Sequence, residues 1–186
     1  DYVRDYTLDD IRKLRVAEGG QPVPTLEEAL DLAAGRVMLF IGLKNYEEES
    51  LIPAFDGRET ANLLLMELYF TCTDQSRVRA LSEATGIAAS LSFMTSRDGL
   101  ADLERVAEQL GQTLRMVCVS RKLITAEFLA RADELGVAVC VSGWKTGEDY
   151  ALVEEGNPGP WRSALESGAV ALVTDQPDAL LTLLGR

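Results

Sequence analysis

The feature that most constrains the fold of this chain is the alternation of short apolar runs with amphipathic stretches. Strands of a parallel sheet have this appearance when helices cover both of their faces. We predict strands over six such runs: Val37–Leu43, Leu68–Thr73, Ile87–Phe93, Leu114–Val119, Val137–Ser142 and Ala169–Thr174. The intervals between them suit one helix and two loops, so the pattern predicts repeated strand–helix units.

Helix start and stop signals fill these intervals. Thr25 stands just before Glu27 and Glu28, where a hydroxyl can cap the first turn and acids favour the helix dipole. The same pattern at a helix start predicts helices over 98–110, 125–135 and 177–184. Gly111 and Gly136 stand where two of these helices should end.

Two architectures use such units, the open doubly wound sheet and the closed eight-stranded barrel. Neither G-x-G-x-x-G nor G-x-x-x-x-G-K-[ST] follows any of the runs, which favours the barrel. A full barrel takes about 250 residues, however, and this chain has 186. We therefore predict an α/β fold, a parallel (βα) TIM-barrel-like domain over 1–186 that is incomplete, with about six units. Open sheet edges expose unpaired backbone groups, so we expect a homo-oligomer or an additional segment to cover them.

Charge and composition exclude several functions. The chain has 18 Lys and Arg against 30 Asp and Glu, a net charge of −12, which disfavours nucleic acid and anionic membranes as partners. No apolar stretch approaches the roughly 20 residues of a membrane span. The chain also has no His, which excludes every His-dependent mechanism for this chain alone.

Three cysteines lie far apart, each inside an apolar run: Cys72, Cys118 and Cys140. We predict buried thiols, with one reactive cysteine as the alternative, and not a disulfide framework. The cysteine pattern does not fix the cellular compartment, although it favours the cytoplasm.

Three blocks of the sequence carry a resemblance to a known family. Pro22–Leu32 (PVPTLEEALDL) followed by Gly35–Lys44 (GRVMLFIGLK) resembles the "iPTLeEvLdl…gr…l.iElK" block of glycerophosphodiester phosphodiesterases. Gly168–Asp178 resembles their closing "GvDGiiTDrPd" turn, and Val3–Leu8 resembles the helix that precedes the first block. The blocks occur in family order along nearly the whole chain.

The resemblance implies a (βα) barrel of lipid metabolism, a phosphoric diester hydrolase that releases glycerol 3-phosphate with Mg²⁺ or Ca²⁺. Two His act as acid and base in the family, and neither motif occurs here, because the family's first two units align before Asp1. Gly42 stands where the family has a metal-binding Glu, and Ser142 stands where it has a Trp. We therefore predict no catalytic residue, no metal ligand and no cofactor in this chain.

The predicted substrate-binding residues are Lys44, Asp74 and Trp144, which follow strands and could meet a small phosphorylated ligand. Lys44 could equally be the first solvated residue after its strand. Asp175 is predicted to cap the last helix, and Glu47–Glu49 to form a solvated acidic run. Arg121 and Lys122 could join Lys44 in an anion site.

Three functional hypotheses follow. The first is a catalytically inactive, phosphodiesterase-like barrel that serves binding or scaffolding. The second is part of an active metal-dependent glycerophosphodiester phosphodiesterase whose His residues lie outside this chain. The third is an unrelated small-molecule α/β protein, which an open sheet would favour.

Overall fold

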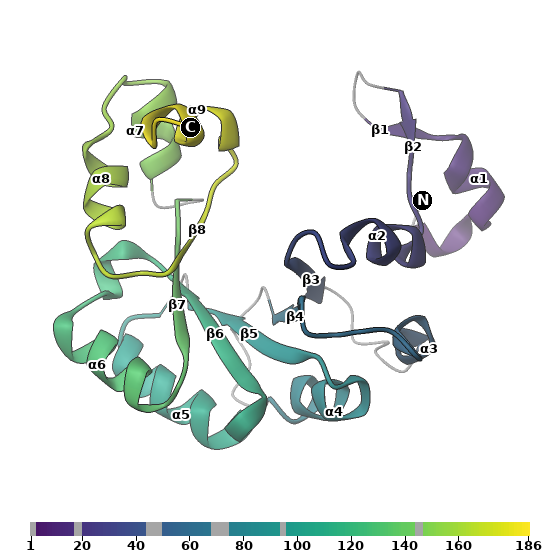
Figure 1. Ribbon diagram of the computed structural model, residues 1–186, viewed down its shortest axis with the longest axis horizontal. Helices are drawn as coiled ribbons and strands as arrows, with labels where there is room; N and C mark the ends of the chain where they lie inside the picture. Colours follow the sequence, from purple (N-terminus) through teal and green to yellow (C-terminus); the bar gives the residue numbers. More distant parts are fainter. Residues whose placement is uncertain (1–2, 17–19, 44–49, 68–74, 94–95, 144–146) are drawn as a thin grey trace.

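The protein is built on one parallel sheet of six strands, seen in a computed structural model that describes residues 3–16, 20–43, 50–67, 75–93, 96–143 and 147–186 (Figure 1). The strands are β3 (Leu39–Leu43), β4 (Leu63–Glu67), β5 (Ala88–Ser92), β6 (Leu114–Val119), β7 (Ala138–Ser142) and β8 (Ala171–Val173). Their order in the sheet is their order in the chain, and every neighbouring pair is parallel. A doubly wound sheet would reverse its strand order at a switch point. The sheet curls without closing, which confirms the predicted α/β, incomplete TIM-barrel-like fold.

Helices connect the strands in the order that the sequence predicts. They are α2 (Leu26–Ala33), α3 (Ile52–Phe55), α4 (Ser76–Thr85), α5 (Gly99–Leu110), α6 (Ala126–Glu134), α7 (Glu148–Val153), α8 (Gly159–Leu165) and α9 (Pro177–Leu183). Short 3-10 helices, Gly111–Thr113 and Arg121–Leu123, flank β6. Before α2 the chain forms a 3-10 turn (Val3–Asp5), α1 (Leu8–Lys13) and a small antiparallel pair, β1 (Arg15–Val16) and β2 (Gln21–Pro22).

The predicted caps fix the helix starts. The Thr25 hydroxyl accepts a hydrogen bond from the Glu28 backbone N–H at 3.2 Å, and the Glu28 carboxylate accepts one from the Thr25 N–H at 2.9 Å. This reciprocal pair satisfies backbone donors that the helix itself leaves unpaired. Thr125 caps α6 and Asp98 caps α5 through one hydrogen bond each, in which the side-chain oxygen accepts a backbone N–H of the first turn.

The second strand differs from its prediction. The described strand β4 covers Leu63–Glu67, ahead of the predicted Leu68–Thr73, and residues 68–74 lie outside the described part of the chain. Apolar residues extend from Leu63 to Cys72, interrupted only by Glu67 and Thr71, so hydrophobicity alone does not place the strand. Its parallel register with β3, which pairs Leu39 with Leu63, places it.

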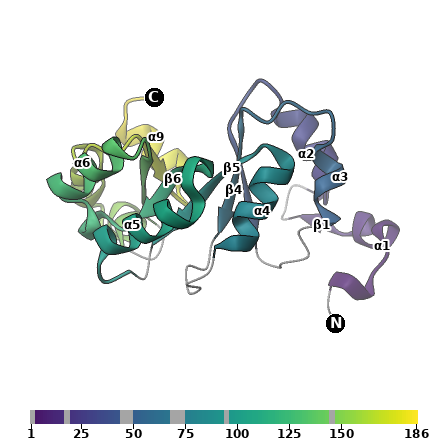
Figure 2. The ribbon, with the colours of Figure 1, turned by 90° about the horizontal axis from the view of Figure 1, so that it is seen from below.

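The two faces of the sheet carry separate apolar clusters. On the convex face, residues such as Leu65, Leu91 and Val117 pack against α4, α5 and α6, which Figure 2 shows on the outside of the curve. Alternate residues face the concave interior, where Leu64, Met66, Met116, Cys118 and Cys140 form a second cluster. The period of two along each strand separates the clusters. The prediction of buried thiols is confirmed for Cys118 and Cys140, while Cys72 lies outside the described residues.

The sheet ends at β3 on one side and β8 on the other. Within the described ranges, neither strand has a partner on its outer side. The homo-oligomer or covering segment expected from these edges stays a prediction, as does the assignment of 1–186 to one domain. None of the described helices is long and apolar enough to cross a membrane.

Candidate functional site

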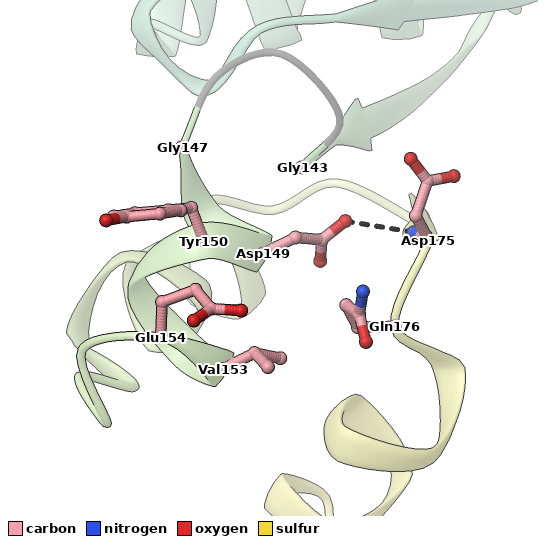
Figure 3. Close-up of a pocket in the computed structure, with 8 residues that line it drawn as sticks. All are labelled: Gly143, Gly147, Asp149, Tyr150, Val153, Glu154, Asp175 and Gln176. Carbon is pink, nitrogen blue, oxygen red and sulfur yellow. Dashed lines mark hydrogen bonds between the residues drawn. The ribbon is translucent and has the colours of Figure 1, made fainter.

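A cavity of about 400 Å³ opens beyond the carboxyl ends of β7 and β8 (Figure 3). Sites of (βα) barrels lie at this end of the strands, because the loops that follow the strands converge there. Two glycines, the exposed face of α7 and the turn after β8 line the cavity: Gly143, Gly147, Asp149, Tyr150, Val153, Glu154, Asp175 and Gln176.

Asp149 holds the walls of this cavity together. Its Oδ1 accepts hydrogen bonds from the Trp161 indole N–H at 3.0 Å and the Thr174 hydroxyl at 2.5 Å. Its Oδ2 accepts the Asp175 backbone N–H at 2.9 Å, the dashed line in Figure 3. One carboxylate therefore ties together α7, α8 and the turn after β8, so Asp149 acts here as a positioning residue.

Close packing behind the cavity explains Gly143. A Cβ atom added at Gly143 would lie 2.1 Å from Cζ2 of Trp161, so only glycine leaves room for the indole ring. Trp161 is fully buried, with Val141, Ala164 and Leu180 around it. The indole ring of Trp161 therefore forms a fixed support behind the cavity.

The electrostatics of the cavity are negative. Three carboxylates line it, those of Asp149, Glu154 and Asp175, and none of the lining residues that the structure describes is basic. Tyr150 adds an aromatic ring that is 63% exposed. A bare phosphate would meet like charge here, whereas hydroxyl groups and cations would find hydrogen-bond acceptors and favourable charge.

Of the two basic residues that follow β6, Arg121 and Lys122, Arg121 contacts a carboxylate of the protein itself. The Arg121 guanidinium lies 3.4 Å from the carboxylate of Glu148, whose side chain is almost fully buried. Arg121 also approaches the Ser163 hydroxyl at 3.4 Å. A buried carboxylate needs a partner because its desolvation is costly. Arg121 is thus engaged with Glu148, while Lys122 is exposed.

The predicted ligand-binding residues Lys44, Asp74 and Trp144 all lie outside the described residues, as do Glu47–Glu49. The prediction for Asp175 is wrong: α9 begins after Gln176, and Asp175 lines the cavity instead. The backbone N–H groups just before α9 are bonded to other side chains. The Thr174 hydroxyl oxygen accepts the N–H of Gln176, and the Asp149 carboxylate accepts the N–H of Asp175.

The described residues do not fit the Mg²⁺ or Ca²⁺ that the family resemblance implies. Such ions need several oxygen ligands, and Gly42 in β3 contributes no side-chain oxygen. Over the ranges that the structure describes, no three His, Cys, Asp or Glu side chains gather in a way that could hold a metal. The expected lack of a cofactor stays a prediction.

Sequence reasoning missed Asp149. An acid in the first turn of a helix is usually explained by the helix dipole, which conceals its role as an acceptor for two other elements. The available signal is the position of the acid just after the end of β7, where barrel sites lie.

These features define the class of the protein: a parallel (βα) barrel fold, open at one side, with a cavity at the carboxyl ends of its strands. Among solved structures, it is similar to one described as a putative glycerophosphodiester phosphodiesterase from Galdieria sulphuraria, with a TM-score of 0.74 and 18% identity. The match covers 100% of this chain and 73% of that chain. At this identity the likeness shows the shared fold. No protein-family model and no curated protein matches the sequence.

Proposed function

We propose that this chain is a glycerophosphodiester phosphodiesterase-like barrel domain that does not hydrolyse phosphodiesters by itself and serves binding or scaffolding. The observation that carries the proposal is that none of its 186 residues is His. Acid and base catalysis near neutral pH relies most often on His, and the resembling family uses a pair of them. The titratable groups of the described cavity are Asp149, Tyr150, Glu154 and Asp175, so an acid–base pair there would have to be built without imidazole.

The surroundings of the site support the same function. Asp149 already accepts three hydrogen bonds from the protein, which suits a structural carboxylate better than a proton-transfer group. Gly42 gives a divalent cation no oxygen, and the acidic cavity repels a phosphodiester in the absence of such a cation. A small phosphorylated ligand would then depend on Lys44, Asp74 and Trp144, as the sequence suggests.

One observation favours a second function. The chain covers 73% of the solved neighbour, so part of that fold has no counterpart here. If the missing part is supplied by further residues, the domain would be one portion of an active metal-dependent enzyme that releases glycerol 3-phosphate.

The test is release of glycerol 3-phosphate from glycerophosphocholine and glycerophosphoglycerol, with Mg²⁺, Ca²⁺ or EDTA, by the chain shown to be folded by circular dichroism. An active phosphodiesterase of the family serves as the positive control. We expect no release above buffer, and none from Gly42→Glu, which restores a carboxylate but no acid–base pair. Release that metal supports and EDTA abolishes would overturn the proposal. The second function would instead be supported by turnover in a longer polypeptide that supplies His residues, lost when those are replaced.

A further inference from the structure

A second cavity, of about 400 Å³, lies at the amino ends of β4 to β7, away from the candidate site at their carboxyl ends. Its wall is mostly apolar. Leu63, Leu64 and Met116 line it and are each more than nine-tenths buried, while Met38 lines it and is 53% exposed. Ligand pockets in proteins span roughly 300–1,000 Å³, so this cavity has room for a small organic molecule.

An irregularity in the sheet brings one cation, Arg115, to this apolar wall. The register between β5 and β6 shifts here, because Ala89 pairs with Leu114 whereas the next residue, Ser90, pairs with Met116. Arg115 is therefore an extra residue in β6. Successive residues of a regular strand point to opposite faces, yet Arg115 and Met116 both line the cavity. Such bulges re-aim side chains and are frequent at barrel rims and beside binding sites.

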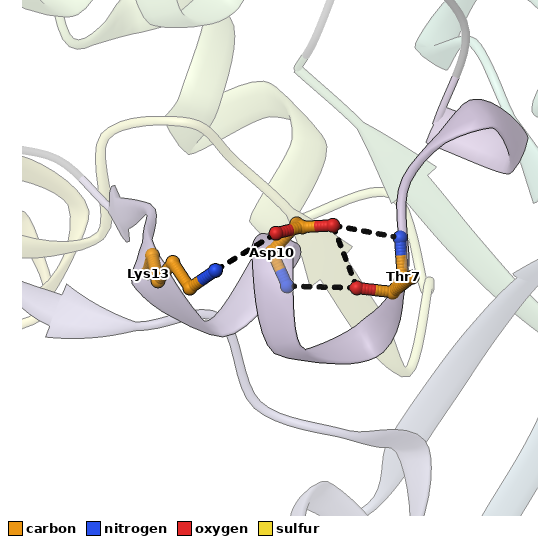
Figure 4. Close-up of polar contacts among 3 residues, drawn as sticks. All are labelled: Thr7, Asp10 and Lys13. Carbon is orange, nitrogen blue, oxygen red and sulfur yellow. Dashed lines mark hydrogen bonds and ion pairs between the residues drawn. The ribbon is translucent and has the colours of Figure 1, made fainter.

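The Arg115 guanidinium is available to a ligand. Arg115 is exposed, and within the described ranges its side chain has no hydrogen-bond or ion-pair partner. By contrast, Lys13 lies 2.8 Å from the Asp10 carboxylate (Figure 4), and Arg131 lies 3.0 Å from that of Glu104. Among the lining residues that the structure describes, none is acidic. An anion in this cavity would therefore meet a positive charge that no lining carboxylate already occupies.

We propose that this cavity binds a medium-chain carboxylate such as decanoate, with the carboxylate on Arg115 and the alkyl chain against Leu64, Met116 and Met38. A guanidinium matches a carboxylate through two parallel N–H···O hydrogen bonds. At the ~30 Å³ that a water molecule occupies in the liquid, the cavity holds roughly a dozen non-hydrogen atoms, which is the size of decanoate. Flexible methionine side chains adapt readily to an alkyl chain. The inference does not depend on the proposed function.

Both parts of such a ligand contribute to binding. The net charge of −12 opposes an anion at a distance, but salt at physiological ionic strength screens exposed charges beyond about 8 Å, so Arg115 has the larger effect inside the cavity. Each methylene that leaves water for the apolar wall strengthens binding by up to about fourfold. Affinity should therefore depend on the positive charge of Arg115 and on the length of the alkyl chain.

The experiment is isothermal titration calorimetry of the full chain with decanoate, octanoate and butyrate, all below micelle-forming concentrations. We expect about one decanoate per chain, binding of octanoate that is about tenfold weaker, and no measurable binding of butyrate. Arg115→Gln should weaken decanoate binding about tenfold, and Ala88→Leu, which fills the cavity, should abolish it. Arg162→Gln is the matched control, because it removes the same charge from an exposed position on α8 that does not line the cavity. It should bind decanoate as the wild type does.

Methionine-methyl NMR of the wild type locates the ligand, because decanoate should shift the signals of Met38 and Met116. The proposal is overturned if the wild type does not bind decanoate, if butyrate binds equally well, or if Arg115→Gln binds as tightly as the wild type or no more weakly than Arg162→Gln. Binding that moves neither methionine signal refutes this cavity as the site. If circular dichroism shows that a variant is unfolded, the chain-length series and the methionine signals of the wild type decide.

Discussion

The contact between Gly143 and Trp161 gives the sharpest test of the structure. In Gly143→Ala the new Cβ would lie 2.1 Å from Cζ2, 2.7 Å from Cη2 and 3.0 Å from Cε2 of the indole ring. The backbone of Gly143 is outside the left-handed region, so alanine adds a steric conflict without backbone strain. The ring cannot easily retreat, because it is fully buried and its N–H is bonded to Asp149.

The cost should lie at the upper end of the range for overpacking, about 3 kcal/mol. For a chain of this size that corresponds to a fall in Tm of roughly 6–12 °C. Urea and thermal unfolding followed by circular dichroism measure both quantities. Gly99→Ala is the matched control: its Cβ would lie 3.3 Å from the Cβ of Leu123, and alanine is favoured in a helix, so its stability should stay within about 1 kcal/mol of the wild type.

A double variant separates this contact from general damage. Trp161→Phe removes the ring atoms that Gly143→Ala would strike, so the double variant should lose less stability than the sum of the single ones, by about 1 kcal/mol or more. The reasoning is refuted if Gly143→Ala unfolds like the wild type, or if the two losses simply add.

Three further predictions concern the polar contacts. Asp149→Ala leaves a buried indole N–H without an acceptor and should cost about 1–3 kcal/mol in urea unfolding, whereas Asp149→Asn keeps an acceptor oxygen and should cost less; equal losses would contradict this role. Thr25→Ala removes the hydroxyl cap of α2 and should cost about 1 kcal/mol by the same measurement, and an unchanged midpoint would count against the cap. The Thr25 backbone N–H, and next the Arg12 guanidinium, hold the pKa of Glu28 below its ordinary value. Its contribution to stability is therefore complete above the unfolded pKa and is lost as the pH falls through the folded one. In an NMR titration Arg12→Ala should raise that pKa only part of the way, because the Thr25 N–H remains; no rise would exclude the ion pair as a cause.

Local signals in the sequence place the later strands well. β5, β6 and β7 begin at or one residue after the predicted starts, because Gly86, Gly111 and Gly136 end the preceding helices or turns clearly. The error at β4 arises where no such punctuation divides the apolar run. The two-residue strands β1 and β2 are too short to show any periodicity, so no pattern could predict them.

The site is harder to predict than the fold. The position of a cavity after β7 and β8 follows from the barrel pattern, but its key contacts join residues distant in sequence. Asp149 meets Trp161 and Thr174 only because α7, α8 and the end of β8 converge. The residues that the sequence did single out, Lys44, Asp74 and Trp144, remain predictions.

The strict sequential order of the strands also governs how the protein opens. Each strand of the sheet pairs only with the strands just before and after it in the chain, as in a repeat array whose stability is a sum of neighbour terms. A closed barrel has no ends, but this sheet has two, and β8 offers only three residues of pairing. Local opening therefore has its lowest free energy at the two ends of the sheet and proceeds inward from them. Backbone amides of β5 and β6 should exchange with deuterium more slowly than those of β8. β5 and β6, which have at least two strands on each side, should therefore be the last strands of the sheet to open.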